Sequence, residues 1–191
     1  MRLFHGGAPG REERLLVRRA RGGDEEAARA LYDRYFDRIY NYAYARLGRV
    51  AEAEDLAIET MTRALTRLDL YEERESGFQS WIYRIAHNAT VDYYRRQGKP
   101  PTVSLEEVDR AMPPSADPSE LALDRIENED LRAAIRRLTD DQQQVLLLRF
   151  FADLSAVDVA RMVGKTVGAV QALQHRALAS LERVLLEVRQ R

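Results

Sequence analysis

Hydrophobic residues recur every three or four positions through most of this chain, the spacing that places them along one face of an α-helix. In the first half the pattern predicts a helix from Asp24 to a stop signal at Gly48, a second at about 52–68 and a third at about 78–96. The polar run YEERESG, residues 71–77, is typical of a loop. Three helices with one apolar face each indicate a small helical domain.

The second half repeats the helical pattern after a break rich in proline. Residues 98–120 contain five of the six prolines and few bulky apolar residues, which predicts an extended linker. Beyond it the pattern predicts helices at about 118–138, 140–151, 155–162 and 166–189. No stretch alternates with a period of two, so we expect an all-α fold. It would comprise two small helical domains, residues 11–97 and 121–191, joined by a flexible Pro-rich linker, with a disordered N-terminus at 1–10.

Two short helices near the C-terminus carry the signals of a helix-turn-helix. Ser155, with Asp158 reaching back, can cap the first helix, and Gly164 can end it. Thr166 can cap the second helix. That helix has an inner face of Val170, Leu173, Ala177 and Leu181, and outward positions Gln171, Gln174, His175 and Arg176. Glutamine pairs with adenine and arginine with guanine or phosphate, which suits the major groove. An ordinary hairpin of two helices with a solvated face is the alternative.

The helix predicted at 78–96 mixes aromatic and basic residues with an asparagine. Seven of its side chains cannot all point inward: Trp81, Arg84, His87, Asn88, Tyr94, Arg95 and Arg96. Aromatic rings interleaved with basic residues suit melted DNA, because unstacked bases rest on such rings. Asn88 can hydrogen-bond a flipped base. The alternative for Trp81 and the tyrosines is that they fill a small helical core.

Acidic side chains gather at the start of the second predicted helix. Between positions 50 and 62 the chain has no basic residue and four acidic ones, Glu52, Glu54, Asp55 and Glu59. Such a strip favours a basic protein partner, although carboxylates in a first turn also offset the helix dipole. The formal net charge of −1 therefore conceals surfaces of different sign.

Composition excludes several classes of protein. Hydrophobic residues make up 45% and charged residues 32%, which argues against wholesale disorder. Cysteine is absent and the three histidines lie far apart, so we expect no disulfide, metal or cofactor. The longest uncharged run, residues 166–175, is much shorter than the roughly 20 residues that span a bilayer. The first residues lack the apolar stretch of a secretory signal. We expect a soluble, cytoplasmic protein without membrane insertion.

The order of these parts resembles that of bacterial sigma factors. Their conserved core domain is similar to the runs LYDRYFDRIYNYAYARLG, AEDLAIETMTRAL and SWIYRIAHNATVDYYRR. Their C-terminal promoter-binding domain is similar to LTDDQQQVLLLRFFADLSAVDVARMVGKTVGAVQALQHRALASL. The short linker resembles that of the extracytoplasmic-function (ECF) subgroup. The similarity covers about residues 11–97 and 121–187.

This resemblance implies a protein that binds core RNA polymerase, recognises and melts specific promoters and directs transcription initiation, without being an enzyme. It implies contacts with the β′ clamp helices for Glu54, Asp55, Ile58, Glu59 and Arg63. It implies minus-10 DNA contacts for Tyr71, Phe78, Trp81, Arg84, His87, Asn88, Arg95 and Arg96. It implies minus-35 contacts for Lys165, Thr166, Gln171, Ala172, Gln174, His175 and Arg176. The resemblance also implies that the second domain binds the β flap and that the linker runs toward the RNA exit channel. It implies an anti-sigma factor that keeps the protein inactive.

The sequence departs from the family pattern in three places. Ile58 stands where the family usually has glutamine, so that contact is not polar. Gln171 stands where a basic residue is common, and Leu173-Gln174 replaces a basic-then-aliphatic pair. Fewer phosphate contacts predict weak, adenine-tolerant minus-35 recognition by this domain.

Two other functions are less consistent with the sequence. A repressor or activator that used only the helix-turn-helix would give no function to the acidic helix at about 52–68 or to the aromatic helix at about 78–96. An enzyme would need a nucleophile–base constellation, a phosphate-binding glycine loop or a metal motif, and the sequence contains none of these.

Overall fold

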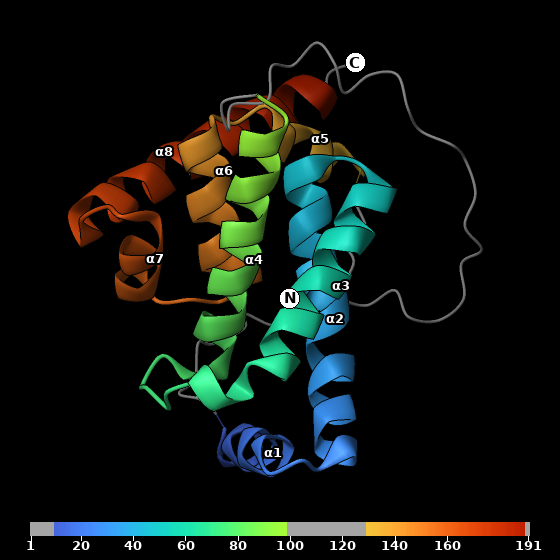
Figure 1. Ribbon diagram of the computed structural model, residues 1–191. Helices are drawn as coiled ribbons and strands as arrows, with labels where there is room; N and C mark the ends of the chain where they lie inside the picture. The colour runs from blue at the N-terminus through green and yellow to red at the C-terminus, as the bar shows by residue number, and fades with distance from the viewer. Residues whose placement is uncertain (1–9, 99–128, 190–191) are drawn as a thin grey trace.

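The computed structural model describes residues 10–98 and 129–189, and within these ranges every regular element is a helix (Figure 1). The first half consists of α1 (Arg11–Arg21), α2 (Glu25–Leu47), α3 (Val50–Thr66), the 3-10 helix η1 (Leu68–Leu70) and α4 (Gly77–Arg96). The second half consists of α5 (Glu129–Arg136), α6 (Asp140–Leu146), the π-helix η3 (Leu147–Phe151), α7 (Ala156–Val163) and α8 (Val167–Arg189). The all-α prediction is confirmed. The predicted linker beyond residue 98, the first nine residues and the start of the helix predicted at 118–138 lie outside the described residues.

Local signals set the ends of the long helices. The carboxylate of Asp24 accepts a hydrogen bond from the backbone N–H of Ala27 at 3.1 Å, which begins α2. This bond and the neighbouring Arg19 lower the pKa of Asp24. At the other end Gly48 adopts φ 70°, a left-handed conformation that glycine reaches without steric cost. Both predicted boundaries of α2 are confirmed.

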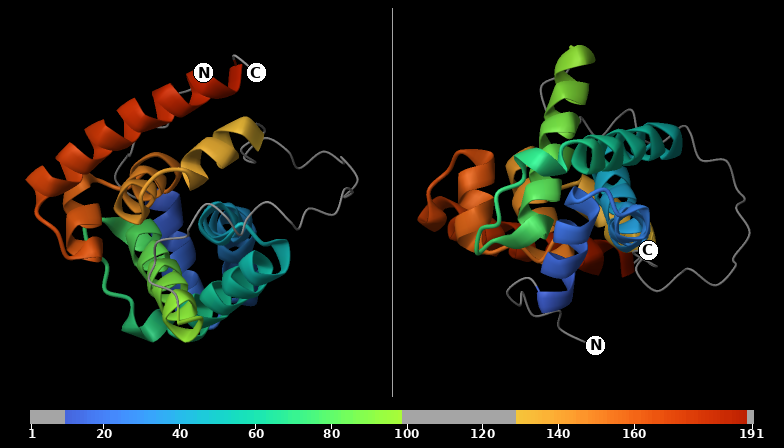
Figure 2. Two further views of the ribbon diagram at one scale, coloured as in Figure 1. Left: turned by 90° about the horizontal axis from the view of Figure 1, so that it is seen from above. Right: turned by 60° about the horizontal axis from the view of Figure 1, so that its bottom comes forward.

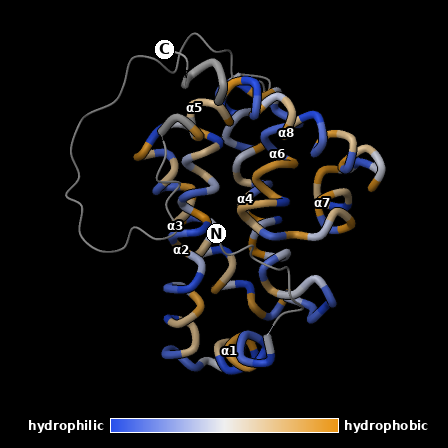
Figure 3. Tube along the Cα trace, turned by 180° about the vertical axis from the view of Figure 1, so that it is seen from behind, coloured by the Kyte–Doolittle hydropathy of each residue, from blue (hydrophilic) through white to orange (hydrophobic). Residues whose placement is uncertain are grey.

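The core of the first half forms where α2 packs against α1 and α3, with α4 closing the group. Its fully buried side chains include Tyr35, Ile39, Met61, Phe78 and Ile82, each at most 1% exposed. Hydrophobic positions recur between hydrophilic ones along these helices (Figure 3). In the second half, α8 packs against α5, α6 and α7 (Figure 2).

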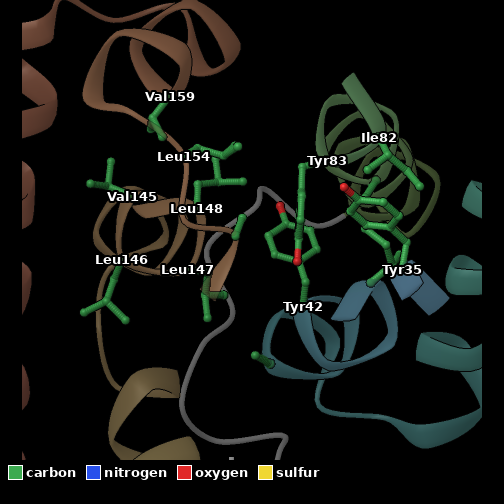
Figure 4. Close-up of a cluster of buried hydrophobic side chains, with 14 of the residues drawn as sticks. Tyr35, Tyr42, Ile82, Tyr83, Val145, Leu146, Leu147, Leu148, Leu154 and Val159 are labelled. Atoms are coloured by element: carbon green, nitrogen blue, oxygen red, sulfur yellow. The ribbon is translucent and has the colours of Figure 1, made fainter. Parts of the chain in front are cut away.

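The two halves pack against each other through one continuous apolar core. This packed arrangement is the closed form of the protein, and separation of the halves would give an open form. Figure 4 shows Tyr42 and Tyr83 of the first half beside Leu147 and Leu148 of the second. Each of these four side chains is at most 1% exposed. The sequence alone left the relative placement of the halves open, and their contact explains why α2 is buried on more sides than one apolar stripe predicts.

A buried ion pair lies within this contact. Arg46, near the end of α2, has 4% of its surface exposed, and its Nη2 lies 2.5 Å from Oδ1 of Asp140, the first residue of α6. Its Nη1 donates to Oε1 of Gln143 at 3.4 Å. The hydroxyl of Tyr94 donates to the backbone carbonyl of Arg46 at 2.5 Å, so α4 supports the same residue.

His87 forms a second polar contact between the halves. Nε2 of Gln144, on α6, lies 2.9 Å from Nδ1 of His87, on α4. Burial lowers the pKa of His87 to about 4, and the charge of Arg46 acts in the same direction. The His87 imidazole is therefore neutral in the closed protein at neutral pH.

A third polar contact between the halves lies nearer the start of α4, where the side chain of Gln79 donates to the carbonyl of Ala152.

We predict that Asp140→Ala opens the protein while both halves remain helical. The substitution leaves Arg46 as an unpaired buried charge, which destabilises the closed form relative to the open form by about 3 kcal/mol. Small-angle X-ray scattering should show a radius of gyration well above the roughly 16 Å of a compact chain of this length. Asp141→Ala is the matched control, because Asp141 pairs with Lys165 inside the second half at 2.9 Å. An equally compact Asp140→Ala variant would contradict the prediction.

We predict that acid favours the open form through His87. Its pKa is about 4 when closed and returns toward the ordinary 6.5 when the halves part. Closure is therefore fully favoured above pH 6.5 and weakens as the pH falls below it, by roughly 2 kcal/mol at pH 5. The separation of the halves can be measured by energy transfer between two dyes. The dyes are attached to cysteines introduced at Leu15 and Leu178, since the chain has no native cysteine. His87→Gln should abolish most of the change between pH 7.5 and 5; an unaltered pH response in that variant would refute the assignment.

Candidate nucleic-acid and polymerase interfaces

Five of the predicted minus-10 residues lie on α4 with at least part of their surface in solvent, and four of them form its outer face. Asn88, Arg95 and Arg96 are exposed, whereas Trp81 and Arg84 are half-buried. Positions 81, 84, 88 and 95 are separated by multiples of one or two helical turns and share a face. The structure therefore brings an aromatic ring, guanidinium groups and a side-chain amide to one surface of one helix.

The other three predicted minus-10 residues lie inside. Tyr71 and Phe78 are 7% and 1% exposed, and their ring centroids lie 5.4 and 5.5 Å from that of Trp81. Burial raises the pKa of Tyr71 to about 12, with Glu13 and Glu73 adding to the shift. His87 is covered by Gln144. In this closed conformation Tyr71 and Phe78 support Trp81 from behind, and His87 faces the second half.

A hollow of about 200 Å³ opens beside this face. It lies where the loop 71–76 leads into α4, and its lining residues are Leu70, Tyr71, Glu72, Arg74, Ser76, Gly77, Trp81 and Arg84. Aromatic rings next to guanidinium groups form the surface that an unstacked base and its phosphate require. Sequence reasoning identified the loop but not the hollow, because its walls come from three separate segments.

The predicted helix-turn-helix is present as α7 and α8. The Ser155 hydroxyl accepts from the backbone N–H of Asp158 at 3.1 Å and donates to the Asp158 carboxylate at 2.6 Å. The carboxylate thus returns to the hydroxyl, not to the Ser155 backbone N–H as the predicted capping box would have it. Gly164 ends α7 at φ 67°, and Thr166 caps α8 by accepting from Ala169 N–H at 3.2 Å.

The faces of α8 agree with the predicted inner and outer positions. Val170, Leu173 and Ala177 are buried. The exposed predicted minus-35 residues are Thr166, Gln171, Ala172, His175 and Arg176.

Two further predicted minus-35 residues are engaged within the protein. Oε1 of Gln174 accepts from Nε of Arg149 at 3.0 Å, and Lys165 pairs with Asp141 at 2.9 Å. Arg149, in the π-helix, also donates to the carbonyl of Leu154. Sequence reasoning did not identify Arg149, because its role depends on the turn between η3 and α7.

The acidic strip follows the exposed side of α3, but it is not without basic partners. Glu54, Asp55 and Ile58 are exposed, with 45% of the Ile58 surface in solvent. Glu59 pairs with Arg63 at 2.5 Å. Glu52 pairs with Arg49 at 2.9 Å, and this hydrogen bond lowers the Glu52 pKa. Arg49 and Arg63 lie just outside segment 50–62, which itself has no basic residue, and they pair with two of its four acidic side chains.

A cleft of about 360 Å³ separates α3 from the end of α4. Its lining residues are Glu52, Asp55, Leu56, Glu59, Ala89, Tyr93, Arg96 and Gln97. The carboxylates of the strip thus border a concave space, which the pattern along α3 alone does not reveal.

Two further findings apply to the described part of the chain. No group of three or more His, Asp or Glu side chains there is arranged to hold a metal ion. No helix within residues 10–98 and 129–189 is long and apolar enough to cross a membrane.

Comparison with known proteins matches both halves in order. The family model described as Sigma-70 region 2 matches residues 31–99, and that described as Sigma-70, region 4 matches residues 128–181. The chain is 38% identical over 170 residues to the ECF RNA polymerase sigma factor BldN of Streptomyces coelicolor, covering 89% of this chain but only 64% of BldN. It is 31% identical over 176 residues to the ECF sigma factor SigD of Mycobacterium tuberculosis, covering 89% of this chain and 83% of SigD.

A solved structure shares the fold. The sigma factor RpoE from Bartonella quintana, in complex with the anti-sigma factor NepR, superposes with a TM-score of 0.61 at 21% identity, covering 78% of this chain and 91% of that one. Together with the two matched regions and the identity to SigD, the order of the two halves identifies the protein. The chain belongs to the extracytoplasmic-function family of RNA polymerase sigma factors.

Proposed function

We propose that this sigma factor binds core RNA polymerase, recognises and melts specific promoters, and so directs transcription initiation. One observation carries the proposal: a single chain places the outer face of α4 and the α7–α8 helix-turn-helix in the order of the two matched sigma-70 regions. The protein acts by binding in the cytoplasm, where the polymerase works, and performs no covalent chemistry. Its proposed domains are residues 11–97 and 121–191.

We assign the polymerase contact of the first half to the exposed face of α3. Glu54 and Asp55 attract basic side chains of the β′ clamp helices, and the adjoining cleft gives such a side chain a place to insert. Ile58 adds an apolar contact at the centre of this charged surface. The Glu59–Arg63 pair continues the same face by one turn. The second half is assigned to the β flap.

Ile58→Asp should weaken binding to core polymerase about tenfold, because a buried apolar contact near the centre of an interface contributes more than 1 kcal/mol. Competition binding with a labelled full-length chain measures the affinity. Leu15→Asp is the matched control, since Leu15 is an apolar side chain on α1 with 52% of its surface exposed. Equal losses in the two variants would argue against the α3 assignment.

We assign minus-10 recognition to the outer face of α4 and the hollow beside it. Asn88 offers donor and acceptor groups to a base edge, and Trp81 offers a ring on which an unstacked base can rest. Arg84, Arg95 and Arg96 supply charge for the phosphates. Strand opening then exchanges base stacking in the duplex for contacts in the hollow.

Asn88→Ala should reduce formation of the open complex about tenfold, since one base contact contributes roughly 1–3 kcal/mol. Permanganate reactivity of unpaired thymines measures the opening, on a promoter selected from a genomic library by run-off transcription. Core binding and thermal stability should not change, because Asn88 is exposed. Full reactivity with the variant would remove Asn88 from the site.

We assign minus-35 recognition to the exposed residues Gln171, His175 and Arg176 of α8. Only one of the three carries a permanent charge, so counterion release contributes little and the isolated half should bind weakly. Lys165 and Gln174 add to the surface only if their contacts with Asp141 and Arg149 are broken.

Recognition of both elements requires the halves to separate. Twenty-five base pairs between the minus-35 and minus-10 positions span about 85 Å, whereas a compact chain of this length has a radius of gyration of about 16 Å. The chain between residues 98 and 129 can extend over about 100 Å. The closed structure is thus the form before promoter binding.

We also propose that an anti-sigma factor regulates the protein. The proposal is supported by the RpoE structure, in which a sigma factor of this fold is bound to the anti-sigma factor NepR. A partner that stabilises the closed form would prevent contact with the two promoter elements at once.

A further inference from the structure

The loop that borders the minus-10 hollow is acidic. Residues 72–75 read Glu-Glu-Arg-Glu, a formal charge of −2 beside a surface assigned to DNA. Glu72 pairs with Arg74 within the loop at 2.6 Å. An uncompensated carboxylate at this place would repel the phosphate backbone, so the contacts of the next residue, Glu73, matter for the function of the loop.

Glu73 is bound by two arginines of α1. Nη2 of Arg18 lies 2.9 Å from Oε2 of Glu73, and Nε of the same arginine donates to that oxygen at 3.3 Å. Nε of Arg14 lies 3.6 Å from Oε1. The Glu73 side chain is 35% exposed, against 74% for Glu72. In the described structure, the ion pairs of Glu73 connect the loop to another helix, whereas the pair of Glu72 stays within the loop.

The helix that carries these arginines is itself fixed to the body of the protein. Val17 and Glu13 of α1 are buried at 4% and 8% exposure, and the Glu13 carboxylate accepts from the hydroxyl of Tyr35 on α2. Nη2 of Arg21 donates to the carbonyl of Asp69 at 3.2 Å, just before the loop. Figure 1 shows α1 at the bottom of the molecule, below the turn that leads into α4.

The space between α1 and the loop is almost filled. A gap of only about 10 Å³ remains, and its lining residues are Glu13, Arg14, Val17, Tyr71, Glu73 and Phe78. Tyr71 borders this gap on one side and the hollow on the other. The wall of the hollow therefore rests on α1.

We propose that α1 is a brace for the minus-10 loop, in which Arg14 and Arg18 act as positioning residues through Glu73. The two guanidinium groups neutralise the carboxylate and hold the loop in the shape that keeps the hollow open beside Trp81. The ligand of the hollow is an unstacked promoter base, so this inference rests on the proposed function. The rival explanation is that the two arginines contact DNA phosphates directly.

A mutant cycle separates these explanations. The full-length chain is bound to core polymerase, and the rate of promoter opening at saturating DNA is followed by 2-aminopurine fluorescence in the melted segment. The variants are Arg14→Gln with Arg18→Gln, Glu73→Ala, and the triple combination. Each should open the promoter about fivefold more slowly, a modest effect because the pairs are exposed. The triple variant should be no slower than the double, because all three residues act as one unit.

Two further variants make the test specific. Reversing the charges, with Glu73→Arg, Arg14→Glu and Arg18→Glu together, should restore at least half of the lost rate. Glu12→Gln is the matched control, because it breaks a pair between α1 and Arg34 of α2, at 3.4 Å, that does not involve the loop; its opening rate should match the wild type. Melting curves should show all variants folded.

Additive losses in the triple variant, or a Glu73→Ala variant that opens DNA at the wild-type rate, would overturn the brace and favour direct phosphate contacts. A wild-type protein that opens no promoter with core polymerase would refute the proposed function itself. Since the first result requires a wild type that does open promoters, the two failures are distinguishable.

Discussion

One buried guanidinium determines how the two halves of this protein fit together. Arg46 lies at the end of α2 with 4% of its surface exposed, and its charge is met by Asp140, 94 positions along the chain. Apolar burial supplies most of the driving force for the contact, but it is not directional. A buried ion is stable only with its partner in place, so the pair selects one arrangement of α6 on α2 from the many that apolar packing permits.

That arrangement decides which side chains remain accessible to partners. On α4 the neighbouring residues His87 and Asn88 point to opposite environments, His87 beneath Gln144 of α6 and Asn88 into solvent. The helix therefore has an inner side that holds the second half and a solvent-exposed outer side, to which the proposed function assigns DNA. The α3 face lies away from this contact, and Ile58 stays exposed in the closed form. If α3 binds polymerase as proposed, that contact can precede opening, whereas the proposed recognition of both promoter elements has to follow it.

Sequence reasoning succeeded where structure is determined locally. Asp24, Gly48 and Gly164 set helix ends through contacts within four residues or through backbone conformation, and the helical repeat located Leu173 on a buried face. It could not locate Arg46, because a basic residue near a helix C-terminus is ordinarily explained by the helix dipole. The burial of His87 also depends on a partner 57 residues away, which no local pattern contains. The hollow and the cleft were missed for the same reason, since each lies between separate helices.

Closure lowers the apparent affinity of the protein for any ligand that needs it open. If the open form is a small fraction of the population, the apparent dissociation constant for such a ligand rises in inverse proportion to that fraction. Each 1.4 kcal/mol of closure free energy therefore weakens two-element promoter binding about tenfold. A ligand of the α3 face would suffer no such reduction, because Ile58 is already exposed in the closed form. Under the proposed function, the free chain would accordingly have a disadvantage on promoter DNA. Contacts of polymerase with α3 alone would not remove it, because a ligand with equal affinity for both forms shifts no equilibrium. Polymerase would have to bind the second half as well and hold it away from the first, and specific initiation would then be confined to the complex.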